Sequence, residues 1–390
     1  MLEKDVSLGH GMTTELEPKD WQNLSLIDIQ ALQQDYPILK GEITLLWHSP
    51  RPFSSAALIQ VNGQARFFIK RSHGSFRSVQ DLMEEHQFIA HLAQKGLHVP
   101  IVISAQNGCS AIAVSAWSYE VHQYTAAQDI YADTLSWKPF FCPEHAYKTG
   151  IILAKMHQAA QDYPVRTGRS TSYLYSNQNL LESEDIITAL MDKIRQSPAL
   201  CHYFSNKVLE PLFLQQLQYT HQNIAIQLRH FPKIWTHNDL HASNLLWCSD
   251  TADSEIAQVI DFGLCDYTCA AYDLAVTVER NFIDWLELSK TNDLSIDMAG
   301  LTQFIHAYVT QNDQIDQLLI LPELLPIIHV DFALSELEYF VAITQNMHHA
   351  DAAYYDWLIA HTAWFFCPQG QIFKTQLMAI IHETVKRIKL

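Results

Sequence analysis

The sequence lacks a long apolar run, and this absence excludes one class of protein. Within its 390 residues, no stretch approaches the roughly 18 consecutive apolar residues that a membrane-spanning helix needs. The opening segment, MLEKDVSLGHGMTTELEPKD, carries acidic residues and has no apolar core of the kind found in secretory signals. We therefore expect a cytoplasmic protein that has no membrane partner.

Positive charge is also scarce. The chain has 25 Lys and Arg against 42 Asp and Glu, which gives a formal net charge of -17. Nucleic-acid backbones bind to clustered Lys and Arg, so this balance argues against DNA or RNA as a partner. A negative field attracts cations, and the same balance favours a cationic or neutral substrate. Apolar residues make up 48% of the chain, enough for a globular protein with a sizeable core.

The seven cysteines show no spacing typical of a disulfide framework. Cys265 and Cys269 stand close together, but the gap between them does not fit a zinc knuckle. We expect reduced thiols, as in the cytoplasm, and we interpret these two cysteines as small buried residues.

Apolar patterning predicts a small β-rich region followed by a larger helical one. The first region begins with a helix at 26–35. Next come strands at 42–48, 55–61 and 65–71, a helix at 78–95, and strands at 110–114 and 119–123. Asn62 and Gly63 separate two of the strands and can both adopt positive φ, which indicates a tight hairpin.

From Pro143 onward the pattern is mostly helical, with a polar stretch at 167–179 that reads as a loop. Helices are expected at 144–160, 183–195, 206–229, 271–288, 299–311, 323–345 and 371–388. The sequence therefore predicts an α+β fold in which a small β-rich lobe precedes a helical lobe. We place the boundaries so that a helical extension covers 1–39, the small lobe covers 40–124 and the helical lobe covers 125–390.

The strongest chemical signal is WTHNDLHASNLLW, residues 235–247. His237, Asp239 and Asn244 form an H-x-D-x-x-x-x-N arrangement, and Asp261 follows in VIDFG. Transfer of a γ-phosphoryl group to an alcohol needs a carboxylate that accepts the hydroxyl proton and oxygen ligands for magnesium. Asp239 suits the first role, and Asn244 with Asp261 suits the second.

His237 and His241 are four residues apart, as in some zinc helices. Such a site needs a glutamate after the first histidine, and Asn238 stands there instead, which argues against zinc. We expect His237 to brace the loop through hydrogen bonds. For His241, a structural role and a substrate-facing role both stay open.

From about residue 40 to 345, these motifs resemble those of the aminoglycoside phosphotransferase and choline kinase group, which are relatives of the protein kinases. The loop differs from the H-R-D of protein kinases, and a second histidine at position 241 is typical of the small-molecule branch. The resemblance implies a two-lobed protein kinase-like fold, with ATP between the small nucleotide-binding lobe and the helical catalytic and substrate-binding lobe. It also implies that Asp239 is the catalytic base and that Asn244 and Asp261 hold Mg2+.

Further positions in the small lobe match the same pattern. Lys70, in RFFIK, stands where the family has its phosphate-binding lysine, and Glu85, in MEEHQFIAHL, matches the helix glutamate that pairs with it. A glycine-rich G-x-G-x-x-G loop is missing, and HSPRPFSS takes its place. We expect backbone amides there and the hydroxyls of Ser54 and Ser55 to contact phosphate. The resemblance therefore implies cofactor-binding roles for Lys70 and Glu85, and we expect such roles for Ser54 and Ser55 as well.

Two further segments carry local resemblances. DYTCAAYDLAVTVE, residues 266–279, is similar to the corresponding segment of homoserine kinase-like and hydroxylysine kinase-like members, where the residue matching Asp273 has a structural role. EEHQF, residues 84–88, is similar to a segment of a stress-response kinase of the same superfamily.

We therefore expect an ATP- and Mg-dependent enzyme that moves the γ-phosphate to a hydroxyl of a small molecule. The acceptor would be an amino alcohol, a hydroxy amino acid, a sugar or an aminoglycoside-like compound. The alternatives are a protein serine/threonine kinase of the stress-response type and a non-catalytic nucleotide-binding regulator, although a degenerate kinase usually lacks one of the key residues. We interpret Asp331, Glu336 and Glu338 as a solvated helix face rather than the lining of a cationic-substrate pocket.

Overall fold

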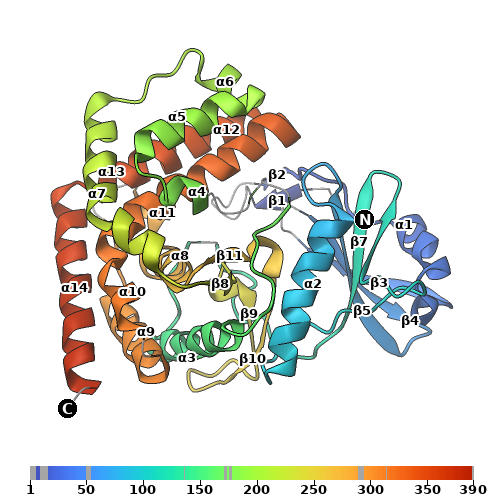
Figure 1. Ribbon diagram of the computed structural model, residues 1–390. Coiled ribbons are helices and arrows are strands. Elements are labelled where there is room, and N and C mark those ends of the chain that lie inside the picture. Colours follow the sequence, from blue (N-terminus) through green and yellow to red (C-terminus); the bar gives the residue numbers. More distant parts are fainter. Residues whose placement is uncertain are drawn as a thin grey trace.

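The computed structural model describes residues 6–8, 16–49, 54–135, 137–170, 174, 178–288, 294–312 and 314–388. Two lobes lie side by side, a small one built around a β-sheet and a larger one built from helices (Figure 1). This arrangement confirms the expected α+β fold with a β-rich N-terminal lobe. The positions of the boundaries at 39 and 124 stay a prediction.

The small lobe contains a five-stranded antiparallel sheet in the order β3-β4-β5-β7-β6. Its strands are β3 (Ile43–His48), β4 (Ser55–Val61), β5 (Ala65–His73), β6 (Ala111–Val114) and β7 (Trp117–Gln123). Asn62 and Gly63 join β4 to β5 with φ values of 51° and 67°, as the sequence predicted for a tight hairpin. In the register between β5 and β7, Lys70 stands opposite Glu120.

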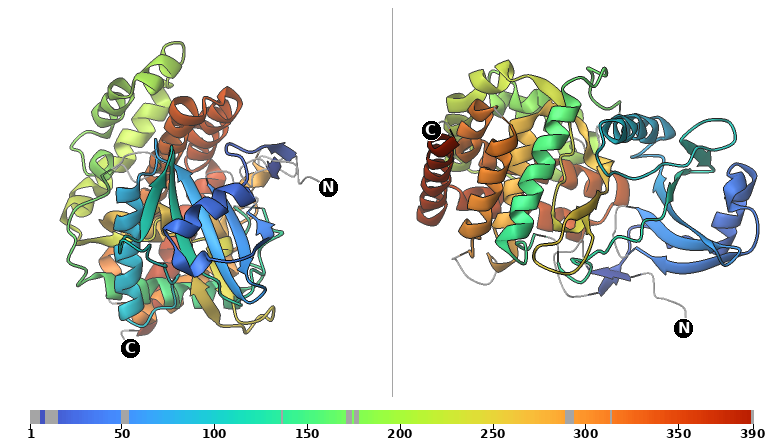
Figure 2. Two further views of the ribbon diagram at one scale, coloured as in Figure 1. Left: turned by 90° about the vertical axis from the view of Figure 1, so that its right-hand side faces the viewer. Right: turned by 90° about the horizontal axis from the view of Figure 1, so that it is seen from below.

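Helices cover both faces of this sheet. On the outer face, α1 (Leu26–Ala31) and the turns that follow it bury Ile29 and Leu32 against Ile59, Ile69 and Val121. On the face toward the large lobe lies α2, Val79–Gln94 (Figure 2). Because successive strand residues point to opposite faces, Lys70 and Glu120 both point toward α2.

The large lobe consists mainly of helices. They are α3 (Pro143–Ala160), α4 (Gln178–Leu181), α5 (Ile186–Gln196), α6 (Pro198–Phe204), α7 (Pro211–His230), α8 (Ala270–Phe282), α9 (Met298–Gln311), α10 (Ile315–Leu319), α11 (Leu321–Tyr339), α12 (Met347–Ala352), α13 (Thr362–Trp364) and α14 (Pro368–Ile388). Most of the expected helices are present with shifted ends. The helices at 347–364 were not predicted. No helix in the described part of the chain combines the length and the apolar character needed to cross a membrane.

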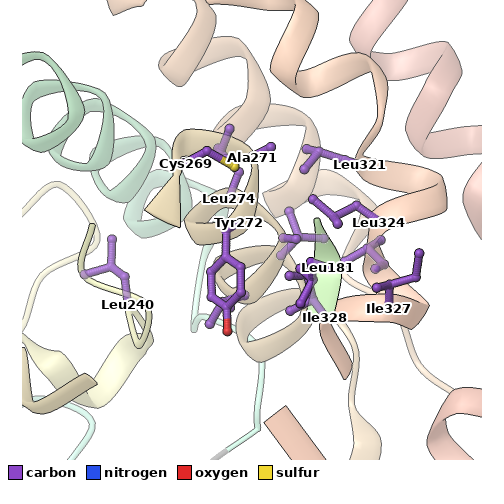
Figure 3. Close-up of a cluster of buried hydrophobic side chains, with 14 of the residues drawn as sticks. Leu181, Leu240, Cys269, Ala271, Tyr272, Leu274, Leu321, Leu324, Ile327 and Ile328 are labelled. Atoms are coloured by element: carbon purple, nitrogen blue, oxygen red, sulfur yellow. The ribbon is translucent and has the colours of Figure 1, made fainter. Parts of the chain in front are cut away.

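Close packing around α8 and α11 forms the centre of this lobe. Side chains from α8, α11, α4 and the loop after residue 236 meet in one buried cluster, with Leu240, Tyr272, Leu274 and Leu324 among them (Figure 3). Leu240 is fully buried and belongs to the segment that carries Asp239. The core therefore anchors the loop on which the strongest sequence motif lies.

Short two-stranded ribbons frame the motif. One pairs β8 (Lys233–Thr236) with β11 (Asp266–Cys269), and the other pairs β9 (Leu245–Trp247) with β10 (Ile256–Val259). The segment 237–244 connects β8 to β9, and 260–265 connects β10 to β11. The two connections therefore lie side by side in the large lobe.

Candidate active site

Asp273 on α8 holds the loop that begins at His237. Its Oδ2 accepts hydrogen bonds from the backbone N–H of His237 at 2.8 Å and from Nε2 of His157 at 3.1 Å. Its Oδ1 accepts from the backbone N–H of Asn238 at 2.8 Å. Burial works against ionisation of this carboxyl, but the hydrogen bond and charge of His157 lower its pKa overall. The expected structural role of Asp273 agrees with these contacts.

The backbone at Asn238 adopts the left-handed region, with φ of 61°. Asparagine tolerates this region better than most residues. Its Oδ1 accepts from the hydroxyl of Thr236 at 2.7 Å and from that of Thr268 at 3.3 Å. This strained turn fixes the path of the chain immediately before Asp239.

Replacing Asp273 by Ala should destabilise the protein strongly, since three buried donors lose their acceptor. The expected loss is about 3–5 kcal/mol of unfolding free energy. Urea denaturation followed by circular dichroism measures it. Asp133→Ala is the matched control, because Asp133 is exposed on a loop, and it should change stability by less than about 0.5 kcal/mol. Equal stabilities for the two variants would contradict the role assigned to Asp273.

His237 braces the loop, as predicted. Its Nε2 donates to the carbonyl of Ile260 at 3.0 Å, and its Nδ1 accepts from the backbone N–H of Asp239 at 3.2 Å. Both ring nitrogens are therefore engaged within the protein, which argues against a zinc ligand at this position. His241 lies with its Nε2 3.8 Å from Oδ2 of Asp239. Its ring thus borders the carboxylate of the motif.

The side chains of Asp239, Asn244 and Asp261 converge. Nδ2 of Asn244 donates to the backbone carbonyl of Asp239 at 2.8 Å and to its Oδ2 at 3.2 Å. The carbonyl of Asn244 accepts from the N–H of Ile260 at 2.9 Å, which places Asp261 one residue away. Asp261 itself has φ of 58°, in the left-handed region. Sequence analysis grouped these three residues, and the structure places them in one neighbourhood.

Arg280 on α8 pairs with Asp239, with Nη1 2.9 Å from Oδ1. Burial raises the pKa of Asp239, Arg280 opposes that shift, and the nearby negative charge of Asp261 adds to it. The guanidinium also lies over the rings of Trp137, at 4.6 Å, and Phe332, at 5.4 Å. Arg280 was not among the predicted site residues, because a pairing across 41 positions leaves no pattern in the spacing.

Lys70 reaches across from the small lobe to Asp261. Its Nζ lies 2.9 Å from Oδ1 of the aspartate, and the two side chains are 14% and 43% exposed. Partial desolvation of Asp261 works against ionisation, but the ammonium group of Lys70 lowers the pKa of the carboxyl to about 2. The site therefore presents an ionised carboxylate at any physiological pH.

The expected ion pair between Lys70 and Glu85 is absent from the contacts of these two residues, and that prediction of their pairing is wrong. Glu85 lies on α2, 3% exposed, with its Oε2 3.6 Å from Nη2 of Arg169. Arg169 also donates to the backbone carbonyls of Asp81, Phe262 and Cys265, and so fixes α2 to the segment after Asp261. The competing partner lies in the polar stretch that the sequence predicted only as a loop. Glu85 still acts on Lys70 through its charge.

The two predicted phosphate-contacting serines lie at the start of β4. The hydroxyl of Ser55 is buried and donates to the carbonyl of Gln22 at 2.5 Å, so this side chain serves the packing of the N-terminal segment. Ser54 is half-buried. Most of the preceding loop, residues 50–53, lies outside the described residues. Phosphate contact by Ser54 and Ser55 stays a prediction.

The acidic residues of α11 are buried, so the prediction of a solvated helix face is wrong. Asp331 accepts from the hydroxyl of Tyr272 at 2.6 Å, and Glu338 pairs with Lys193 at 2.7 Å. Glu336 is 8% exposed and has neither a hydrogen bond nor an ion pair to a side chain in the described part of the protein. Burial and the charges of Asp239, Glu279 and Asp20 raise its pKa to about 8, and Arg280 opposes this rise.

The donor set fits a divalent ion that prefers oxygen. Because Nδ2 of Asn244 is used by Asp239, the amide oxygen of Asn244 is left without a hydrogen bond among the described residues. With the ionised carboxylate of Asp261, it offers one neutral and one charged oxygen, as magnesium sites do. The residues present therefore fit a magnesium-bound nucleotide, with the ammonium of Lys70 beside it.

The sequence also matches a known protein family. A family model described as "Phosphotransferase enzyme family" matches residues 53–308. A search of curated protein sequences gives no match.

Solved structures share the fold. A microcompartment-associated aminopropanol kinase has a TM-score of 0.60 at 17% identity, covering 91% of this chain and 99% of its own. A GDP complex of an aminoglycoside 2'-phosphotransferase has a TM-score of 0.58 at 12% identity, covering 89% and 100%. The amicoumacin kinase hAmiN, in complex with AMP-PNP, Ca2+ and Ami, has a TM-score of 0.54 at 15% identity, covering 84% and 91%. These likenesses confirm the predicted kinase-like fold.

Proposed function

The chain belongs to the phosphotransferase enzyme family, as its motifs indicated, and on this basis we propose that it transfers the γ-phosphate of ATP to a hydroxyl of a small cationic molecule. It is a phosphotransferase with an alcohol group as acceptor. The observation that carries the proposal is the convergence of Asp239, Asn244 and Asp261 at one place, with Lys70 joined to it from the other lobe.

Each residue has a proposed role. Lys70 orients the α- and β-phosphates, while Asn244 and Asp261 hold the magnesium ion. A magnesium ion held there would offset the negative charge of the phosphates. Asp239 orients the acceptor hydroxyl and takes its proton, a task suited to a partly buried carboxylate with a raised pKa. Glu85 acts on Lys70 through its charge and through the position of α2.

Arg280 supports the proposed role of Asp239. A cation 2.9 Å from Oδ1 opposes the rise in the pKa of this partly buried carboxyl group and restricts its rotamer. The remaining oxygen, Oδ2, accepts from Asn244 and lies toward His241. We propose that the acceptor hydroxyl approaches this oxygen.

The acceptor side of the site is acidic, which supports a cationic acceptor. Glu336 contributes a buried carboxylate without a side-chain partner among the described residues, within electrostatic reach of Asp239. A substrate ammonium group beside it would favour the ionised form of that carboxyl group and pair with it. Amino alcohols and hydroxy amino acids carry an ammonium group close to a hydroxyl. The aminopropanol kinase, by its name, is a structural neighbour that acts on an amino alcohol.

A thermal-shift screen tests the proposed acceptor class. Amino alcohols, hydroxy amino acids, sugars and aminoglycosides would be added to the protein with Mg2+ and a non-hydrolysable ATP analogue. An acceptor should raise Tm through its binding to the folded state. Phosphorylated product is then sought with ATP. Peptide substrates and GTP belong in the same screen, because a response to peptides alone would favour the stress-response type of protein kinase instead. The proposed compartment is the cytoplasm, in keeping with seven free cysteines.

Glu336→Gln should raise KM for a cationic acceptor by about 10- to 100-fold, the loss expected for one hydrogen bond to a charged group. KM for ATP should change little. Because the carboxyl has a pKa of about 8, affinity for the cationic acceptor should rise as pH increases through 8 in the native protein. The variant should lack this rise. If KM for the cationic acceptor did not depend on pH in the native protein, Glu336 would not bind the acceptor.

The stability of the same variant gives a second measurement. The pKa of Glu336 is raised from its ordinary value of 4.5 to about 8, so the folded state holds more protons than the unfolded state between these values. Its contribution to stability therefore falls as pH rises through this window. Glu336→Gln should remove that slope, as urea denaturation at several pH values would show.

A further inference from the structure

A cluster of three possible metal ligands lies in the small lobe, and the proposed transfer reaction uses none of them. His86 on α2 and Glu120 with His122 on β7 each place one donor atom within 4.8 Å of the others. Nε2 of His86 is 2.9 Å from Oε2 of Glu120, and Nε2 of His122 is 2.6 Å from the same oxygen. The three side chains thus face one point.

The local structure explains why they meet. Glu120 and His122 are two residues apart on a strand, so both point to the sheet face that α2 covers. His86 comes from the buried side of α2. The side chains are 3% exposed for His86, 2% for Glu120 and 13% for His122. Only the edge of the cluster at His122 reaches solvent.

The cluster is not fully satisfied by its internal hydrogen bonds. Nδ1 of His86 and Oε1 of Glu120 are buried and have no hydrogen-bond partner in the described part of the chain. Burial works against ionisation of Glu120, but the two imidazoles hold the pKa of its carboxyl well below the ordinary value. Neutral imidazoles and a carboxylate are groups that bind metals, and the cluster supplies two of the first and one of the second.

We propose that His86, Glu120 and His122 bind a transition-metal ion of the zinc class, which ties α2 to β7. Two imidazoles and one carboxylate are ligands that zinc takes in proteins, whereas magnesium and calcium prefer oxygen alone. With metal–ligand bonds of about 2.0–2.2 Å, tetrahedral donors lie about 3.3 Å apart. Starting from 2.9 Å and 2.6 Å, His86 therefore has to move away from Glu120 by about 0.4 Å and His122 by about 0.7 Å. Water completes the coordination from the exposed edge at His122.

The position of this site connects it with the phosphate-binding side of the small lobe. Glu120 stands opposite Lys70 in the sheet, and its charge acts on the ammonium group of that lysine. Helix α2 also carries Glu85, so the position of Glu85 depends on how α2 is held against β7. An ion joining α2 to β7 fixes the helix relative to Lys70. The inference stands on this cluster and does not depend on the proposed acceptor.

Zinc binding to the full-length, chelator-treated protein tests the proposal. Zn2+ would be titrated against a competing zinc-sensitive dye at neutral pH. One equivalent should bind with a Kd of about 1 µM or tighter. Glu120→Gln should weaken binding at least about tenfold. The amide oxygen of this variant still accepts hydrogen bonds from both histidines, so the fold is retained. His122→Gln should have a similar effect, and Zn2+ should raise Tm more in the native protein than in these two variants.

Two matched variants exclude other zinc sites. His98→Gln removes an exposed histidine outside the cluster, and Asp261→Asn removes the proposed magnesium ligand. Both should bind Zn2+ as the native protein does. A Kd that is unchanged in Glu120→Gln and His122→Gln would overturn the proposal, as would the absence of a tight equivalent. In either case the cluster would only join α2 to β7 through hydrogen bonds.

Discussion

Asp239→Asn is expected to lower kcat by about 10²- to 10⁴-fold, the range that a positioned general base contributes. The asparagine keeps the size of the side chain and one oxygen for Arg280, so the pocket should retain its shape. Nucleotide binding should change little, because the proposed action of Asp239 is on the acceptor hydroxyl. Steady-state kinetics with the acceptor from the screen, and titration with a fluorescent ATP analogue, measure the two effects separately.

Asp253→Asn is the matched control for this substitution. Asp253 is exposed on the turn between β9 and β10, and its amide variant should have native kinetics. Asp239→Ala is less informative, because it leaves the buried guanidinium of Arg280 without its carboxylate and lowers stability as well. If Asp239→Asn turned over at nearly the native rate with every acceptor, the role of general base would belong to another group.

Asp261→Asn is expected to abolish metal-dependent nucleotide binding. A carboxylate with a pKa near 2 is replaced by a neutral amide, so the ionic attraction to a divalent ion is lost. Affinity for the Mg2+–nucleotide complex should fall by more than about 10- to 100-fold, the loss typical of residues that only support a ligand. Calorimetric titration with a non-hydrolysable ATP analogue, with and without Mg2+, measures it.

The comparison between the two metal conditions is decisive here. In the native protein Mg2+ should strengthen nucleotide binding, while in Asp261→Asn it should have little effect. Asp253→Asn again serves as the control. If Mg2+ strengthened binding equally in the native protein and in Asp261→Asn, the proposed metal ligand would be wrong.

Local signals in the sequence were sufficient for the small-lobe hairpin and for α2. The Asn62–Gly63 hairpin and α2 follow from backbone preferences and apolar periodicity, which act over a few residues. Asp239, Asn244 and Asp261 could be grouped because chemistry requires those residue types and the family places them at such spacings. Their convergence depends on two short ribbons that have no strong strand signal of their own.

Partners far apart in the sequence could not be predicted. Glu85 pairs with Arg169 and not with Lys70, and Asp239 pairs with Arg280. Packing between α2, α8 and the loops brings these groups together. The acidic residues of α11 looked like a solvated face, but this helix is surrounded by others and is buried on all sides. Tertiary contacts therefore decided the partners and the burial of these charged groups.

The most direct test of phosphoryl transfer uses radioactive ATP labelled at the γ-phosphate, with Mg2+ and the acceptor panel. Label should pass to a small molecule in the presence of the native protein. It should pass far more slowly with Asp239→Asn, although that variant binds nucleotide normally. Label that appears only as inorganic phosphate, or that transfers equally with both proteins, would contradict the account.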